Sequence, residues 1–212
     1  TARMGQRRRD DIVSIARKYD LHIIEDECFA ATQSALPSLR ALAPERVWFV
    51  GSLSKSVSAA LRFGYAVCPT GMGEAGRLTA QHSFFALARP VSELCQELLS
   101  SGQGAEIRAR VQQDLSARLQ IMVNRLGAFN LSWQPGMPFG WLRLPQGWRA
   151  SSFTRMAEDM GVLVRSADEY ALFHGRAPNA VRLAVVGNIP RQQYESGLAE
   201  LAHLLPRPPS DL

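Results

Sequence analysis

The sequence predicts an α/β fold in which a largely parallel sheet is followed by a smaller α+β domain. Amphipathic helical patterns alternate with short, nearly continuous apolar runs in the first part of the chain. This alternation is typical of parallel sheets that are covered by helices. A long amphipathic stretch then separates that part from a second group of helices and strands. The 212 residues, 46% of them hydrophobic, are enough to bury one large core or two modest ones.

The first domain, expected over residues 1–104, begins with a helix and continues with three strands. The helix is predicted at 7–19, where apolar residues recur at helical spacing as Ile12, Ile15, Ala16 and Tyr19. The strands are short runs rich in branched or aromatic side chains, expected at 21–25, 47–51 and 63–68. A mainly helical stretch follows, and we expect it to break near Arg89-Pro90 and again at 101–104.

A connecting helix is predicted at 105–126. Its apolar residues recur every three or four positions, at Ile107, Val111, Leu115, Leu119, Met122 and Leu126. Residues 127–212 are expected to form the second domain, a smaller α+β unit. Its elements alternate along the chain, with strands at 141–144, 162–164 and 181–186 and helices at 151–160 and 190–204.

A single lysine lies in a turn of small residues directly after the second predicted strand. The turn reads Gly-Ser-Leu-Ser-Lys-Ser at 51–56, and Arg62 follows Lys55 by seven positions. Such a turn presents one amine at a sheet edge, where desolvation and nearby cations lower the pKa of a lysine so that it attacks an aldehyde. A solvated lysine in a polar turn explains the same residues, so this motif needs a second, independent one beside it.

Three acids, Glu25, Asp26 and Glu27, end the first predicted strand. A carboxylate at this place can pair with a protonated pyridine nitrogen and keep the ring an electron sink. A capping or solvated acidic turn is the alternative.

The order of these motifs resembles the fold-type I pyridoxal-phosphate (PLP) aminotransferases of class I/II, and most closely the aminotransferase-like domain of MocR-type GntR regulators. The motifs are an arginine-rich helix, Ile-Ile-Glu-Asp-Glu at 23–27, Gly-Ser-Leu-Ser-Lys at 51–55 and Arg-Phe-Gly-Tyr at 62–65. The resemblance covers nearly the whole chain and is strongest over the first third. It implies a partial PLP-dependent transferase fold, in which the first domain is the C-terminal half of the PLP-binding large domain.

The resemblance also implies roles for individual residues with pyridoxal 5'-phosphate as cofactor. Lys55 corresponds to the lysine that forms the internal aldimine, and Asp26 to the aspartate that pairs with the pyridine nitrogen. Ser52, Ser54 and Arg62 correspond to residues that hold the phosphate. These roles also suit the side chains, because a guanidinium fork and serine hydroxyls both donate hydrogen bonds to phosphate oxygens. For Arg62, a surface cation beside a strand is the alternative.

One cofactor-contacting position departs from the family pattern. MocR-like chains usually have a tyrosine two residues after the pyridine-binding aspartate, and this chain has Cys28 there. A thiol is shorter than a phenol and a weaker hydrogen-bond donor. We therefore expect altered cofactor electronics, or a water that fills the gap, and less efficient transamination.

A further arginine, Arg182, interrupts the apolar strand predicted at 181–186. A guanidinium inside such a strand is costly unless an anion meets it. In the resembling family this position binds the substrate α-carboxylate. The alternative is a structural ion pair with an acid such as Asp168 or Glu169.

The resemblance also implies partners. The family places a glycine-rich phosphate loop before the point where this sequence opens, so we expect a chain that is truncated at its N-terminus. DNA would be bound only through a winged helix-turn-helix domain that is absent from these residues. Family members form homodimers, and we expect the same here, with an amino acid or amine as ligand. The isolated half-domain is expected to oligomerise, to aggregate or to need its missing half.

Composition excludes several other classes of protein. Three cysteines without CxxC spacing and four scattered histidines indicate neither a disulfide framework nor a metal site, and they fit a reducing cytoplasm. No apolar run approaches the roughly 20 residues that a membrane span needs. The net charge of +5 and the run Arg7-Arg8-Arg9 are better explained by a solvated helix face than by nucleic-acid binding.

Two functional hypotheses remain open. The first is the effector-binding part of a PLP-dependent transcription regulator, in which aldimine exchange at Lys55 reports an amine. The second is a stand-alone aminotransferase that moves an amino group between an amino acid and a 2-oxo acid, with Lys55 as the general acid and base.

Overall fold

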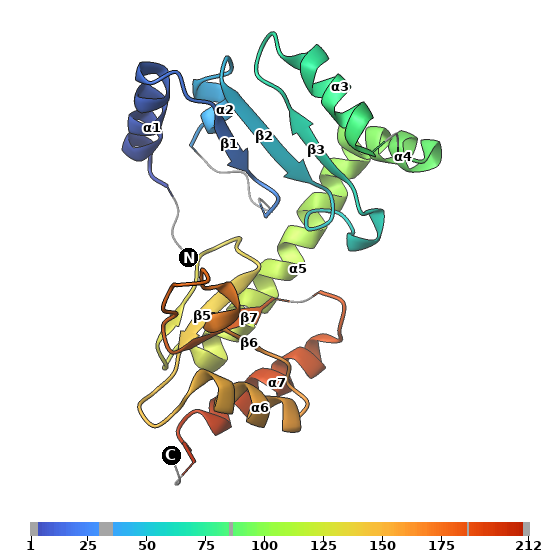
Figure 1. The fold of residues 1–212 in the computed structure, drawn as a ribbon. Coiled ribbons are helices and arrows are strands. Elements are labelled where there is room, and N and C mark those ends of the chain that lie inside the picture. Colours follow the sequence, from blue (N-terminus) through green and yellow to red (C-terminus); the bar gives the residue numbers. More distant parts are fainter. Residues whose placement is uncertain (1–3, 30–35, 85–86, 186, 210–212) are drawn as a thin grey trace. The chain divides into compact units, whose positions relative to one another are not determined.

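The computed structural model describes residues 4–29, 36–84, 87–185 and 187–209, and the chain divides into two compact units. We call Ala2–Gln112 the N-terminal unit and Gln113–Leu212 the C-terminal unit. The boundary falls inside helix α5 (Gly102–Leu126), which contributes residues to both units (Figure 1).

The N-terminal unit is built on a sheet with the strand order β1-β2-β3. The strands are β1 (Ile23–Asp26), β2 (Val47–Ser52) and β3 (Gly64–Val67). β1 and β2 are parallel, as the sequence predicts, whereas β3 runs antiparallel to β2. The helices of this unit are α1 (Gln6–Lys18), α2 (Leu39–Leu42), the 3-10 helix η1 (Ala59–Leu61), α3 (Gly73–Phe84) and α4 (Arg89–Ser100), followed by the first part of α5.

Helix α1 forms because one of its faces is apolar and packs on the sheet. A small core joins α1, α2 and the start of β2, and its buried members are Val13, Leu39, Ala43 and Val47. The helix ends where Asp20 takes a left-handed conformation, with φ 51°, and the Leu21 N–H returns to the Ala16 carbonyl at 2.8 Å. Aspartate tolerates this conformation better than most residues, so the chain can turn directly into β1.

The three arginines of α1 do not share one environment. Arg7 and Arg8 are exposed, as a solvated helix face requires, but that interpretation is wrong for Arg9, which is buried. Arg9 pairs with the buried carboxylate of Glu25 at 3.4 Å. The same carboxylate accepts the backbone N–H groups of Leu39 and Arg40 at 2.8 and 2.9 Å, at the start of α2. Glu25 therefore fastens β1 to both helices.

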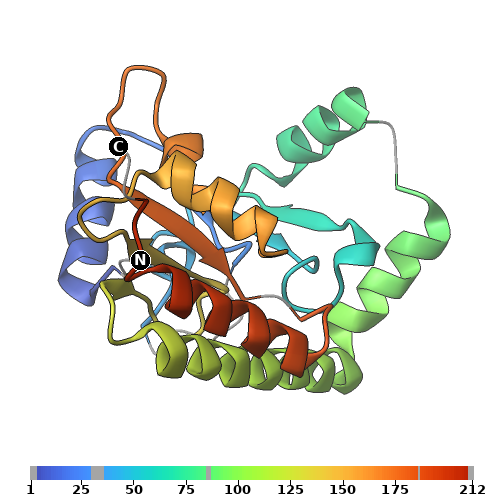
Figure 2. The ribbon, with the colours of Figure 1, turned by 90° about the horizontal axis from the view of Figure 1, so that it is seen from below.

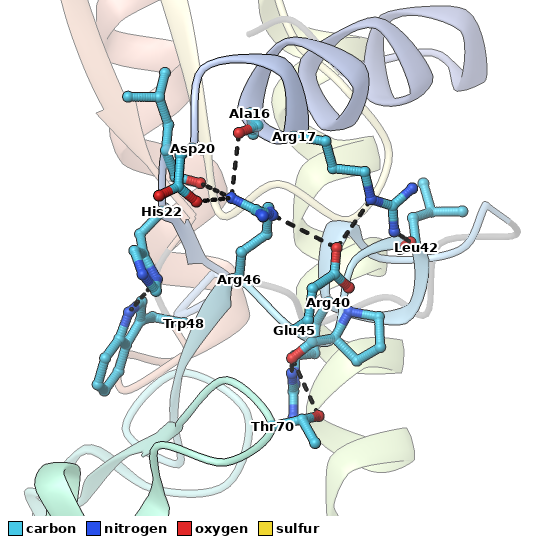
Figure 3. A network of polar contacts seen from close by, with 12 residues as sticks. Ala16, Arg17, Asp20, His22, Arg40, Leu42, Glu45, Arg46, Trp48 and Thr70 are labelled. Atoms are coloured by element: carbon cyan, nitrogen blue, oxygen red, sulfur yellow. Dashed lines mark hydrogen bonds and ion pairs between the residues drawn. The ribbon is translucent and has the colours of Figure 1, made fainter.

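A second polar network holds the end of α1 against the start of β2 (Figure 3). The Arg46 guanidinium donates to the carbonyls of Ala16 and Leu21 at 3.2 and 3.1 Å. Arg17 donates to Glu45 at 2.9 Å, and this hydrogen bond lowers the pKa of the Glu45 carboxyl to about 2. These contacts anchor β1 and β2 at the ends where they begin, and the carboxyl ends of both strands lie at the opposite end of the sheet.

The C-terminal unit is a four-stranded sheet with the order β4-β5-β7-β6, and each of these pairings is antiparallel. Its strands are β4 (Leu131–Ser132), β5 (Phe139–Arg143), β6 (Arg165–Ser166) and β7 (Ala180–Ala184). Its helices are α6 (Ala150–Asp159), the 3-10 helix η2 (Ala167–Tyr170) and α7 (Arg191–Leu204). They bury a core that includes Met122, Leu126, Leu142, Phe153, Val181 and Leu201.

Helices α5 and α7 lie side by side in this unit (Figure 2). Arg125 of α5 pairs with Glu195 of α7 at 2.6 Å, and Arg191 of α7 pairs with Asp114 of α5 at 2.9 Å. Asp114 also accepts from Arg118 at 2.7 Å, and the two arginines together lower the pKa of its carboxyl. These ion pairs fix α7 along the part of α5 that follows the unit boundary.

One sequence-based expectation on secondary structure is wrong. The strand expected at 162–164 does not form, because the Val162 N–H closes the end of α6 by donating to Ala157 at 2.8 Å, and the strand β6 begins later. The break expected at 101–104 is confirmed, because α4 ends at Ser100, Ser101 has an extended backbone and α5 begins at Gly102. A side chain at Gly104 would collide with the Leu98 carbonyl, so this glycine permits close packing of α4 and α5 and does not end a helix.

We predict that Arg9→Leu in the complete protein lowers the free energy of unfolding by about 3 kcal/mol, because it leaves the Glu25 carboxylate buried without its countercharge. Urea denaturation followed by circular dichroism measures the change. The control is Arg8→Leu, which removes a neighbouring but exposed arginine and should change stability by less than about 0.5 kcal/mol. Equal effects of the two substitutions would contradict a structural role for Arg9.

Candidate cofactor site

The parallel pairing of β1 with β2 places the turns that follow these two strands at the same end of the sheet. Asp26, the last residue of β1, lies opposite Val50 in the ladder, and the Glu27 N–H donates to the Val50 carbonyl at 2.9 Å. The turn that carries Lys55 begins where β2 ends at Ser52. Ligands of α/β proteins bind at the carboxyl ends of strands, which is the edge where both turns lie.

The lysine turn is hydrogen-bonded at its base and exposed at its tip. Leu53 is 2% exposed and its carbonyl accepts the N–H groups of Val57 and Ser58 at 2.9 and 3.1 Å. The Ser56 hydroxyl donates to the Ser52 carbonyl at 3.2 Å. Lys55, at the tip, is exposed, so the desolvation expected from the sequence is not provided within this unit.

The two serines expected to hold a phosphate differ in their hydrogen bonding. The Ser52 hydroxyl donates to the Phe63 carbonyl and accepts from the Ser54 N–H, both at 3.1 Å. Because a hydroxyl has one proton, Ser52 would have to give up Phe63 in order to donate to a phosphate. Among the contacts of the described residues, the Ser54 hydroxyl has no such commitment.

Arg62 follows the 3-10 helix η1 and has a left-handed backbone, with φ 47° and ψ 37°. This conformation costs a residue with a side chain about 1 kcal/mol. The next residue, Phe63, is tied to the lysine turn, because its carbonyl accepts from the Leu53 N–H at 3.1 Å. Arg62 is exposed and forms no ion pair within the described part of the chain, so its guanidinium is available to an anion.

Asp26 and Cys28 form a compact unit in the other turn. The Cys28 N–H donates to the Asp26 carboxylate at 2.9 Å, which orients that carboxylate. Partial burial, together with the hydrogen bond and the charge of Asp26, raises the pKa of the Cys28 thiol to about 11. Cys28 is therefore a neutral thiol at physiological pH.

Arg182 belongs to the C-terminal unit, where it occupies the middle of β7. Its Nη1 atom and the hydroxyl of Tyr170 are hydrogen-bonded at 2.9 Å, and its guanidinium lies 4.4 Å from the centre of the Phe139 ring. The acids proposed from the sequence as alternative partners are engaged elsewhere, Asp168 by Ser166 and Glu169 by Arg165. Arg182 is thus held by aromatic side chains and meets no carboxylate among the described residues.

Sequence reasoning missed the aromatic surroundings of Arg182. Trp141 lies directly opposite Arg182 in the ladder of β5 and β7, and its ring meets that of Tyr170 edge to face at 5.4 Å. Trp141 is visible in the sequence as the first residue of a predicted strand, but the register that places it beside Arg182 is not.

The described residues offer neither a metal cluster nor a membrane-spanning helix. Within 4–29, 36–84, 87–185 and 187–209, no group of three or more His, Cys, Asp or Glu side chains is placed to hold a metal ion. In the same ranges no helix is both long and apolar enough to cross a bilayer.

Comparison with known proteins identifies the family. The model of the family "Aminotransferase class I and II" matches residues 8–201. The chain belongs to the class I and II aminotransferase family. Membership in this family supports pyridoxal phosphate, the cofactor expected from the sequence.

Among curated proteins, the chain is similar to the uncharacterized HTH-type transcriptional regulator YdeF of Bacillus subtilis (strain 168). The two are 28% identical over 208 residues, which are 97% of this chain and 45% of YdeF. The chain therefore spans about half the length of the relatives it matches.

Solved aminotransferases share the fold. The α-aminoadipate aminotransferase LysN of Thermus thermophilus, complexed with N-(5'-phosphopyridoxyl)-L-leucine, superposes with a TM-score of 0.82 at 24% identity, over 95% of this chain and 54% of LysN. The kynurenine aminotransferase of Pyrococcus horikoshii, in complex with PMP, gives a TM-score of 0.81 at 20% identity, over 96% of this chain and 52% of that enzyme.

The residues at the sheet edge of this aminotransferase-family chain suit the groups of pyridoxal phosphate. An aldehyde, a basic ring nitrogen and a phosphate require an amine, a carboxylate and a cation with hydroxyl donors. Lys55, Asp26, Arg62 and Ser54 supply these groups from turns that leave one edge of the sheet. The donor set therefore fits the cofactor.

We predict that alkylation of Cys28 by iodoacetamide, in the complete protein without cofactor, follows a titration with a midpoint near pH 11, because only the thiolate reacts and the pKa is raised. Peptide mass spectrometry across a pH series measures it. Asp26→Asn removes the carboxylate charge and should move the midpoint to lower pH. A wild-type midpoint near the ordinary value, about 8.5, would contradict the prediction.

Proposed function

We propose that this chain is the ligand-sensing part of a MocR-type transcription regulator that binds pyridoxal phosphate and responds to an amine or amino acid. The observation that carries the proposal is the parallel register of β1 and β2, which sets Asp26 and the turn of Lys55 at one edge of the sheet. Similarity to the regulator YdeF over 97% of the chain favours a regulator.

The proposal extends to the complete protein. It would be a cytoplasmic homodimer, and a winged helix-turn-helix segment outside these 212 residues would bind DNA. The cysteines of the chain, Cys28, Cys68 and Cys95, are free thiols, which suits a reducing compartment.

Each side chain of the site has a distinct role in this proposal. Bound pyridoxal phosphate supplies an aldehyde that condenses with amines and a ring that withdraws electrons. Lys55 offers its amine from the tip of the turn, and Asp26 holds a positive charge on the ring nitrogen through its carboxylate. Arg62 and Ser54 bind the phosphate, and Arg182 binds the carboxylate of an amino acid ligand through its guanidinium fork.

A stand-alone aminotransferase is the second candidate function. It is favoured by the solved neighbours, whose TM-scores of 0.82 and 0.81 come from aminotransferases. The two functions differ in outcome, because an enzyme releases a 2-oxo acid in many turnovers, whereas a sensor needs only an equilibrium change on ligand binding.

We predict that borohydride reduction of the complete protein with pyridoxal phosphate fixes one cofactor per chain on Lys55, and that Lys55→Ala abolishes the adduct. Peptide mass spectrometry locates it, and circular dichroism verifies that the variant is folded. A shift of the visible band on adding an amino acid, without loss of that band and without oxo acid release, would support a sensor. An adduct on another residue of the Lys55→Ala variant would contradict the assignment of Lys55 as the residue that binds the cofactor.

We further predict that Arg62→Gly weakens cofactor binding without lowering the stability of the cofactor-free protein. Affinity for pyridoxal phosphate should fall at least about tenfold, since charge-assisted hydrogen bonds to the phosphate are lost. The unfolding free energy of the cofactor-free protein should stay the same or rise by up to about 1 kcal/mol, because glycine relieves the left-handed backbone. Arg62→Lys is the matched control, as it keeps the charge and the strain. Unchanged affinity in Arg62→Gly would make Arg62 a surface cation only.

A further inference from the structure

Two arginines lie next to each other on the sheet of the C-terminal unit. In the antiparallel ladders, Arg182 of β7 lies directly opposite Arg165 of β6, and Trp141 of β5 lies directly opposite Arg182 on its other side. Side chains that are opposite each other in such a ladder share a face, and their Cβ atoms are about 5 Å apart. Like charges in this arrangement destabilise a sheet, so each guanidinium needs a partner that holds it.

Two successive residues of the 3-10 helix η2 hold these arginines in different ways. Glu169 pairs with Arg165 through its carboxylate at 3.0 Å. Tyr170, the next residue, accepts a hydrogen bond from the Arg182 guanidinium at 2.9 Å through its neutral hydroxyl. Arg165 is therefore neutralised, whereas Arg182 is held in place and keeps its charge.

The Tyr170 side chain is itself fixed by its neighbours. Its ring meets the Trp141 ring edge to face, with the ring centres 5.4 Å apart and the planes at 81°. The Arg182 guanidinium lies 5.2 Å from the centre of the Tyr170 ring and 4.4 Å from that of Phe139. Aromatic contacts of this kind restrain both side chains without adding a negative charge.

The Tyr170 hydroxyl can still donate a hydrogen bond. A phenol hydroxyl carries one proton besides its acceptor capacity, and its oxygen already accepts from Arg182. Within the described residues, no hydrogen bond takes up that proton and no carboxylate meets Arg182. Tyr170 and Arg182 thus present a neutral donor and a cation at adjacent atoms, and this combination suits a carboxylate, which accepts at both oxygens.

We propose that Tyr170 is a further residue of the carboxylate site, which holds the Arg182 guanidinium without neutralising it and donates its own proton to the same ligand carboxylate. The inference rests on the proposed function, in which Arg182 binds that carboxylate. It also explains why η2 places a phenol beside one arginine and an acid beside the other. An acid at position 170 would neutralise Arg182 as Glu169 neutralises Arg165.

The experiment compares amino acids with amines that lack only the carboxylate. The matched pairs are L-alanine with ethylamine and L-norleucine with pentylamine, so the result does not depend on one side chain. Binding to the complete protein with pyridoxal phosphate is followed by the shift of the cofactor's visible band and by isothermal titration calorimetry. In the wild type we expect each amino acid to bind at least about tenfold more tightly than its amine.

Two variants of Tyr170 test the inference through this affinity ratio. Tyr170→Phe keeps the ring and removes the hydroxyl, and it should lower the ratio at least about threefold by weakening the amino acids and not the amines. Tyr170→Glu should bring the ratio close to that of Arg182→Gln, because its carboxylate neutralises the guanidinium. A residue that only supports the fold would change both members of a pair alike. Circular dichroism verifies that each variant is folded.

The control is Tyr19→Phe, which removes the hydroxyl of an exposed tyrosine at the end of α1 and should leave the ratio unchanged. A ratio that Tyr170→Phe leaves at the wild-type value, while Arg182→Gln lowers it, would overturn the inference and leave the Arg182 assignment standing. Equal affinities within both pairs in the wild type would overturn the Arg182 assignment and the inference together. If no member of either pair binds, the proposed function fails and the inference fails with it.

Discussion

The buried carboxylate of Glu25 holds in place the end of β1 that carries Asp26, and the proposed cofactor site depends on this anchoring. It takes one charged partner from α1 and two backbone N–H groups from the start of α2, so a single side chain ties β1 to both helices. A buried charge is tolerated only when it is paired and hydrogen-bonded in this way. Side chains alternate along a strand, so the residue after Glu25 must point to the opposite face. Asp26 therefore owes its outward direction to the inward anchoring of Glu25.

This alternation explains which parts of the site could be predicted from the sequence. Asp26 and Lys55 were proposed because they lie at or shortly after the end of an apolar strand, and Arg62 because it directly precedes one, so these signals are local. The role of Ser52 was harder to predict, since its hydroxyl is committed to the Phe63 carbonyl across the antiparallel pair of β2 and β3. That commitment depends on the strand register, which no local pattern in the sequence reveals. The phosphate donor is consequently better sought at Ser54.

Long-range contacts also explain why the partners of Arg182 differ from those expected from the sequence. The sequence suggested an acid as the alternative partner of Arg182, but the nearby acids Asp168 and Glu169 satisfy neighbours within four residues. The guanidinium instead lies against Phe139 and Tyr170. Aromatic rings hold an arginine in place without neutralising it, so the positive charge remains available to a ligand. An acid in the same place would have consumed the charge that the proposed function requires.

The thiol of Cys28 bears on whether the site serves turnover or sensing. Burial and the neighbouring Asp26 raise its pKa to about 11, so at neutral pH it stays a short, weakly donating group with no charge. A phenol at this position would reach farther and donate more strongly to an oxygen of the cofactor. In the proposed site, weak donation from Cys28 would alter the cofactor's electronics and slow the proton transfers that an enzyme must repeat in every cycle. A sensor needs only that ligand binding shifts an equilibrium, and the groups for binding, Arg62 and Arg182, are intact and unpaired by acids among the described residues. In the proposed site, Cys28 would weaken the part of the chemistry that a regulator can do without.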